Sequence, residues 1–140
     1  MVIGRPVIAS GLTEEQVKDH IIRTGTVPEQ LLRELVRLIV EEIHPERILL
    51  FGSAARGRMR AGSDLDILVV KSGVHRRRTA QVLYSRLPDI PISKDILVAH
   101  PEDLESYRDD PGYIYGAILE EGRVLYSRPA PGAGGAPADA

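Results

Sequence analysis

The sequence contains no cysteine and no tryptophan, and it has one phenylalanine and two methionines among 140 residues. The absence of cysteine excludes disulfide frameworks, cysteine-based zinc sites and thiol nucleophiles. No apolar run approaches the roughly 18 residues that a membrane-spanning helix needs. The first ten residues carry Arg5 and Pro6 in place of an apolar signal core. These absences predict a cytoplasmic protein with no membrane association.

An excess of charge of either sign is also missing. The 18 Lys and Arg residues nearly balance the 20 Asp and Glu residues, which leaves a net charge of −2. A protein that binds nucleic acid mainly through phosphate charge would need a basic excess, so bulk binding of this kind is not expected. The length predicts one ordinary domain, and a hydrophobic content of 43% is typical of globular proteins.

Helical and strand-like patterns alternate along the chain. Apolar residues at helical spacing, with capping and proline signals, predict helices over residues 13–25, 28–43, 76–87, 102–110 and 113–120. Short apolar runs predict strands over residues 47–51, 64–70, 93–98 and 123–126. This order predicts an α/β (α+β) domain, in which a small mixed β-sheet is flanked by helices.

The chain divides into three segments. Residues 1–27 are expected to form an N-terminal helical extension, residues 28–127 the main domain, and residues 128–140 a disordered tail of proline, glycine and alanine. The apolar stripe over residues 31–43 is interpreted as core, and its width leaves room for a homo-oligomer or a partner interface.

Two carboxylates mark the start of the second predicted strand. Side chains alternate between the faces of a strand, so Asp64 and Asp66 point the same way about 7 Å apart, while Leu65 and Ile67 point into the core. Two carboxylates on one face repel each other unless a cation lies between them. Hard oxygen ligands of this kind suit Mg²⁺ bound together with substrate phosphates.

A glycine-containing turn precedes these acids by about ten residues. Gly52 and Ser53 follow the first predicted strand and offer backbone amides and a hydroxyl to an anion. Arg56, Arg58 and Arg60 add positive charge with no acid between them. A phosphate-binding turn and a dicarboxylate metal site are therefore predicted at the same end of two neighbouring strands.

The run Phe-Gly-Ser-Ala-Ala-Arg-Gly at residues 51–57, followed by Asp-Leu-Asp at residues 64–66, resembles the signature of the DNA polymerase beta nucleotidyltransferase superfamily. Within it, residues 31–126 are most similar to the minimal nucleotidyltransferase domains. The resemblance implies a polymerase beta-like palm, in which Gly52 and Ser53 bind the phosphates of a nucleoside triphosphate. It also implies that the paired aspartates hold two Mg²⁺ ions, and Arg56 is an additional candidate phosphate contact.

The same resemblance implies a third acid on a neighbouring strand, which helps to activate the attacking hydroxyl. Asp95 fits this role because strand alternation places it with Ser93 and Leu97, opposite the apolar face. Asp89 is the alternative, but it lies in a loop between two prolines. We therefore expect Asp64, Asp66 and Asp95 to be the catalytic and metal-binding residues.

The function implied by the resemblance is Mg²⁺-dependent transfer of a nucleoside monophosphate, from ATP or another nucleoside triphosphate, to a hydroxyl of a protein or RNA acceptor. Minimal nucleotidyltransferases are commonly antitoxins that pair with a HEPN-type ribonuclease toxin, which makes such a toxin the expected protein partner. The alternatives are a non-catalytic module that neutralises a partner by binding, and transfer to a small molecule or a tRNA.

Other conspicuous residues are interpreted as structural. The four histidines show no metal-ligand spacing and are expected to have ordinary surface or boundary roles. The five tyrosines are scattered along the sequence and are expected to be packing residues. The arginine run at residues 76–78 is interpreted as the solvated start of a helix, with RNA contact as the alternative.

Overall fold

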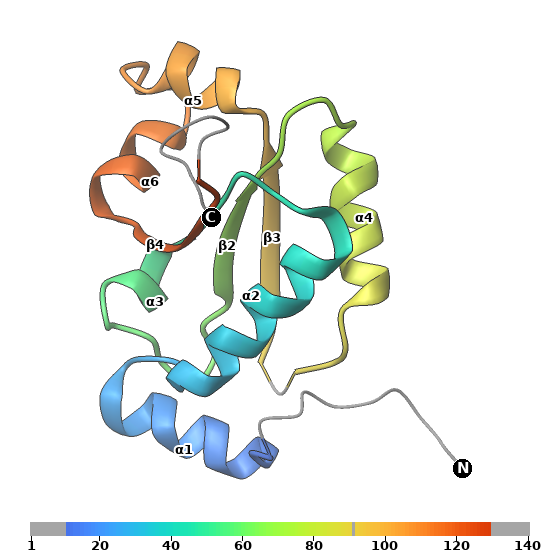
Figure 1. The fold of residues 1–140 in the computed structure, drawn as a ribbon. Helices are drawn as coiled ribbons and strands as arrows, with labels where there is room; N and C mark the ends of the chain where they lie inside the picture. Colours follow the sequence, from blue (N-terminus) through green and yellow to red (C-terminus); the bar gives the residue numbers. More distant parts are fainter. Residues whose placement is uncertain (1–10, 91, 130–140) are drawn as a thin grey trace.

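Four strands form a mixed sheet in the computed structural model, which describes residues 11–90 and 92–129 (Figure 1). The strands are β1 (Arg47–Phe51), β2 (Leu65–Val70), β3 (Lys94–Ala99) and β4 (Arg123–Ser127), and their order in the sheet is β3-β2-β1-β4. Strand β3 runs parallel to β2, whereas β1 runs antiparallel to both β2 and β4. The predicted fold class, an α+β domain with a small mixed sheet, is confirmed.

Helices cover both faces of this sheet. They are α1 (Glu14–Thr24), α2 (Glu29–Ile43), α3 (Gly52–Ala55), α4 (Arg76–Arg86), α5 (Pro101–Tyr107) and α6 (Tyr115–Glu121). Helices α1, α2 and α4 contribute to the hydrophobic cluster on one face, and α5 and α6 contribute to the cluster on the other. The single-turn helix α3 connects β1 to the loop that leads to β2.

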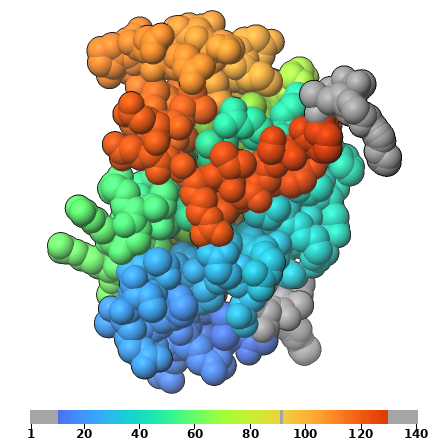
Figure 2. Space-filling model, turned by 60° about the vertical axis from the view of Figure 1, so that its left-hand side comes forward, coloured from blue at the N-terminus to red at the C-terminus, as the bar shows by residue number. Residues whose placement is uncertain are grey.

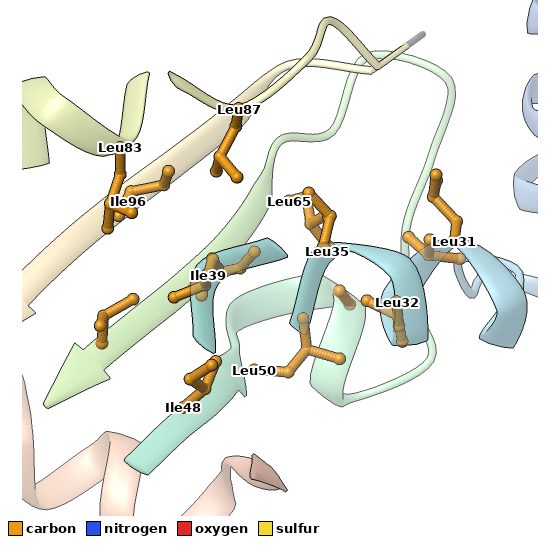
Figure 3. Close-up of a cluster of buried hydrophobic side chains, with 14 of the residues drawn as sticks. Leu31, Leu32, Leu35, Ile39, Ile48, Leu50, Leu65, Leu83, Leu87 and Ile96 are labelled. Atoms are coloured by element: carbon orange, nitrogen blue, oxygen red, sulfur yellow. The ribbon is translucent and has the colours of Figure 1, made fainter. Parts of the chain in front are cut away.

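The larger cluster lies between α2 and the sheet. Leu31, Leu35 and Ile39 recur at helical spacing on α2 and are almost completely buried, as are Ile48 and Leu65 from the strands (Figure 3). Burying one such aliphatic side chain contributes about 1.5–3 kcal/mol relative to leaving it exposed. This cluster therefore fixes the position of α2 across the sheet.

Local signals set the ends of the first two helices. Thr13 and Gln16 form the predicted capping box of α1, and Gly25 ends this helix in the left-handed conformation with φ of 74°. Helix α2 ends at Ile43 and is capped by His44, which is also left-handed with φ of 49° and is followed by Pro45. The predicted start and end of α1 and the predicted end of α2 are confirmed.

The second face of the sheet carries apolar and acidic side chains at opposite ends. Leu68 and Val70 of β2 are buried in the cluster that also includes Ile118 of α6. Because side chains alternate, Asp66 lies on this same face, two residues nearer the start of the strand. The acidic end of the face is accessible, since Asp95 of the neighbouring strand is exposed.

Two sequence expectations concern other parts of the chain. The predicted disordered tail falls almost entirely on residues 130–140, which lie outside the described residues. Among the helices of residues 11–90 and 92–129, none is long and apolar enough to cross a membrane.

Candidate active site

Two of the predicted acids face each other across the pair of parallel strands. Asp66 of β2 and Asp95 of β3 are register partners. The third, Asp64, is exposed immediately before the start of β2. Asp89, the alternative to Asp95, lies in the loop after α4 and not on a strand. The tertiary structure thus brings Asp95, and not Asp89, opposite Asp66 in the sheet.

The electrostatics of Asp66 show how close the three acids are. Partial burial raises the pKa of Asp66, and the negative charges of Asp95 and then Asp64 raise it further, while the Arg56 guanidinium opposes them. Like charges at close range disfavour the ionised form, and a cation among them would relieve the repulsion. The acidic end of the sheet therefore favours a positively charged ligand.

Gly52 is required where β1 passes into α3. Its φ of 70° lies in the left-handed region, which residues with a side chain adopt at a cost. A Cβ atom at this position would overlap the Oδ2 atom of Asp66 at a distance below 3.0 Å. Register pairing explains the proximity, because Phe51 of β1 lies opposite Asp66 of β2. The glycine thus lets the turn lie directly against the acid.

Ser53 and Arg56 follow this glycine in and just after α3. The loop after α3 folds back on the helix, since the Arg58 amide donates to the Ser53 carbonyl oxygen at 2.9 Å. Ser53 is half-buried, whereas Arg56 is exposed and lies 3.6 Å from a carboxylate oxygen of Glu121. The charge of Arg56 lowers the pKa of Asp66, so among the three predicted arginines it is the one that acts on this acid.

Tyr84 is a contact of the site that the sequence did not reveal. Its hydroxyl oxygen accepts a hydrogen bond of 2.7 Å from the Ile96 amide and lies 3.4 Å from Oδ1 of Asp95. It comes from α4, whereas Asp95 lies on β3, and their spacing of 11 residues matches no local pattern. The contact depends on how α4 packs beside the strand, so no sequence signal could have identified it.

Three tyrosines that are scattered in the sequence come together at α5 and α6. The ring centroids of Tyr107 and Tyr113 are 4.0 Å apart, and those of Tyr113 and Tyr115 are 6.3 Å apart, both in stacked geometry. Arg76, the first residue of the arginine run, lies at the start of α4 and pairs with Asp103 at 2.9 Å. Stacking gives these tyrosines packing contacts, whereas Arg76 makes an ion pair with α5 in addition to its exposure to solvent.

The three acids are potential ligands for a divalent cation. Their chemistry suits Mg²⁺, which takes carboxylate oxygens together with substrate phosphates. Within the described residues, no group of three or more histidine, aspartate or glutamate side chains is close enough to form a ready-made metal site. Asp64 and Asp95 are thus each within electrostatic range of Asp66, but the three side chains do not form a ready-made coordination shell.

The chain is similar to known proteins in two respects. The family model for polymerase beta, nucleotidyltransferase, matches residues 33–130. A crystal structure of a candidate nucleotidyltransferase from Sulfolobus solfataricus is similar, with a TM-score of 0.49, 16% identity and coverage of 86% of this chain and 93% of that chain. No curated protein sequence matches the chain.

The family match extends over most of the chain and includes Gly52, Asp66 and Asp95. It defines the class of this protein as a nucleotidyltransferase domain. The chain belongs to the polymerase beta nucleotidyltransferase family. Helix α1 precedes the matched range, which begins within α2.

Proposed function

We propose that this protein transfers a nucleoside monophosphate, AMP from ATP in the first instance, to a hydroxyl group of a protein or RNA acceptor. The observation that carries the proposal is the pairing of Asp66 with Asp95 beside the turn at Gly52. A module that only binds a partner has no need for carboxylates that repel each other on one face of a sheet. Metal-assisted transfer of a phosphate-bearing group does need them.

Each residue has a distinct role in the proposed reaction. The acceptor hydroxyl oxygen attacks the α-phosphorus of the triphosphate, and the bond to the bridging oxygen breaks so that pyrophosphate leaves. Ser53 and the backbone at Gly52 bind the β- and γ-phosphates, and Arg56 adds a phosphate contact. Asp95 orients the acceptor hydroxyl and takes its proton.

Asp64, Asp66 and Asp95 are the residues that would hold Mg²⁺, two ions in the proposed complex. When bound, the metal lowers the pKa of the acceptor hydroxyl and neutralises the charge of the leaving phosphates. The raised pKa of Asp66 supports this assignment. Beside the negative charges of Asp64 and Asp95, ionisation of Asp66 is unfavourable unless a cation is bound.

The proposed biological setting is that of an antitoxin whose acceptor is a HEPN-type toxin on another chain. This part of the proposal comes from the resemblance to minimal nucleotidyltransferases. An RNA acceptor is the second candidate, and the exposed arginines at residues 76–78 are the cations that would contact it.

Labelling tests the transfer reaction. The purified protein, radiolabelled ATP, CTP, GTP or UTP, MgCl₂ and an extract of the source cells are expected to yield a labelled protein or RNA. We expect Asp64→Ala and Asp95→Ala to abolish labelling, whereas Asp89→Ala labels like the wild type. Equal labelling by all four proteins, or none with any nucleotide, would contradict the proposed enzyme. A wild type that binds a toxin without labelling it would favour the binding module.

Nucleotide binding is expected to stabilise the fold only with a divalent cation. A ligand present at 100 times its Kd adds about 2.7 kcal/mol to the free energy of unfolding, which a thermal melt detects easily. MgCl₂ with ATP is therefore expected to raise the Tm of the wild type, and EDTA to remove the shift. The same shift in Asp66→Asn would mean that the metal is bound elsewhere.

A further inference from the structure

The turn between α1 and α2 touches the loop that follows the proposed phosphate-binding turn. The Met59 amide donates to the carbonyl oxygen of Gly25 at 2.9 Å. A Cβ atom at Gly25 would overlap the carbonyl oxygen of Gly57 at a distance below 3.0 Å, so the two backbones meet with no room for a side chain. In Figures 1 and 2 the segment that follows α3 lies next to α1. We call residues Thr24–Thr26 the clamp turn.

The clamp turn is itself held by α1. The hydroxyl of Thr24 donates to the His20 carbonyl oxygen at 2.7 Å, and the Thr26 hydroxyl lies 3.2 Å from Nε2 of His20. Val17 and Ile21 of α1 are 0% and 2% exposed within the main core. The position of the clamp turn is therefore determined by the core and by side-chain hydrogen bonds.

The clamp turn contacts the loop that follows α3, and this loop is itself hydrogen-bonded to α3. The Gly57 amide donates to the Ala54 carbonyl oxygen at 3.3 Å, and the Arg58 amide reaches back to Ser53. Met59, at the end of this loop, is buried in the main core with 4% exposure. A shift of the loop at Gly57 would therefore be passed to Ser53 and Arg56.

A cavity of about 460 Å³ opens beside this contact. Its lining includes His20 and Thr26 on one side and Ala55, Arg56 and Gly57 on the other. Side chains therefore do not fill the whole space between the clamp turn and α3. The backbone contacts at Gly25 are well placed to set the position of the loop.

We propose that α1 and the clamp turn are positioning elements of the nucleotide site, which hold the loop after α3 so that Ser53 and Arg56 face the triphosphate. This inference rests on the proposed function for its effect on nucleotide binding. It assigns a role in the site to a helix that lies before residue 33, where the family match begins. Gly25 acts through the loop and touches no substrate.

The test compares Gly25→Ala with Gly73→Ala. Both glycines have left-handed backbones, with φ of 74° and 73°, so both substitutions introduce similar backbone strain. At Gly73 an added Cβ would meet nothing within 4 Å, whereas at Gly25 it would push against Gly57. The pair therefore separates displacement of the loop from strain alone.

Three measurements are made on the full chain: the Kd for ATP with MgCl₂, the KM and kcat of labelling, and amide hydrogen exchange over residues 52–59. Gly25→Ala is expected to raise the Kd and KM about tenfold or more, since small misplacements of binding groups have effects of this size, and to lower kcat much less. In the Gly25→Ala variant the Met59 amide hydrogen is expected to exchange faster than in the wild type. Gly73→Ala is expected to match the wild type in all three.

An affinity and amide exchange for Gly25→Ala no different from those of Gly73→Ala would overturn the inference. If Gly25→Ala does not fold, Thr26→Val replaces it, because it removes the hydroxyl contacts while keeping the shape of the side chain. Thr26→Val is expected to weaken ATP binding and to expose the Met59 amide, and wild-type values would overturn the inference. If the wild type binds no nucleotide, the proposed function fails, while amide exchange over residues 52–59 still decides whether the clamp holds the loop.

Discussion

Asp66→Asn is expected to abolish nucleotidyl transfer and at the same time to raise the melting temperature. Loss of an outer-shell partner of a metal site already costs about 10–100-fold, so loss of this proposed ligand is expected to cost more than about 100-fold in activity. The Asp66→Asn variant is expected to be more stable than the wild type because Asp66 lies opposite Asp95 in the sheet, and the substitution removes one of the two negative charges. Like charges directly opposite each other destabilise a sheet, and we expect an effect of the same order as the roughly 0.2–1 kcal/mol that favourable cross-strand pairs contribute.

The stability effect has a defined pH dependence. Because the pKa of Asp66 is raised in the folded protein, the folded chain holds this proton more tightly than the unfolded chain does. The stabilising effect of protonation is fully present below the ordinary pKa of 3.8 and is lost as the pH rises through the folded-state pKa. The Asn variant is therefore expected to exceed the wild type in Tm at pH 7, and this difference should shrink on acidification.

Thermal melts from pH 7 down to pH 4 without divalent cations, together with the labelling assay, measure both effects. Asp109→Asn is the matched control, since Asp109 is an exposed acid in the loop between α5 and α6. The Asp109→Asn variant is expected to show the same labelling as the wild type and the same dependence of Tm on pH. A lower Tm for Asp66→Asn at pH 7 would show that Asp66 is stabilising, contrary to the repulsion proposed here.

Gly52→Ala is expected to be among the most damaging substitutions at the site. An alanine in the left-handed conformation costs about 1–2 kcal/mol from strain alone. Here the added Cβ would also collide with the Asp66 carboxylate, so either this side chain must rotate out of its place or the turn must move. We expect a loss of stability larger than that of Gly73→Ala, and activity reduced to the level of Asp66→Asn.

Urea unfolding of Gly52→Ala and Gly73→Ala measures this difference, because both carry strain and only Gly52 faces the carboxylate. A double-mutant cycle with Asp66→Gly then isolates the collision. In the Asp66→Gly background, Gly52→Ala is expected to cost no more than Gly73→Ala does in the wild type. If Gly52→Ala destabilises the Asp66→Gly variant as much as it destabilises the wild type, the collision with Asp66 is not the cause of the destabilisation.

The secondary structure could be predicted closely because its signals are local. The capping box at Thr13, the apolar spacing of α2 and the apolar run of β2 each depend on residues within one element. Predicted boundaries differ from the observed ones mainly at the ends. The helix predicted over residues 102–110 spans Pro101–Tyr107, and α2 begins at Glu29 with Pro28 as its cap.

The candidate site could be predicted in part for the same reason. The alternation of side chains along a strand placed Asp95 on the face opposite Ile96 and Val98 from the sequence alone. The strand predicted over residues 64–70 begins only at Leu65, so Asp64 precedes the strand that carries Asp66. The contact between Tyr84 and Asp95, the overlap that Gly52 avoids and the clamp at Gly25 were not predicted. Each joins residues of different elements, so it depends on how those elements pack.

The sequence by itself determined an α+β domain without cysteine, with a glycine-serine turn and two acids near the start of a strand, because these features follow from composition and from short-range periodicity. Only the tertiary structure decided that Asp95 lies opposite Asp66, that Arg56 is the arginine whose charge acts on Asp66, and that the turn after α1 contacts the loop after α3. These contacts come from strand register and helix packing. Both are set by the burial of side chains that are distant in the sequence, which no local pattern records.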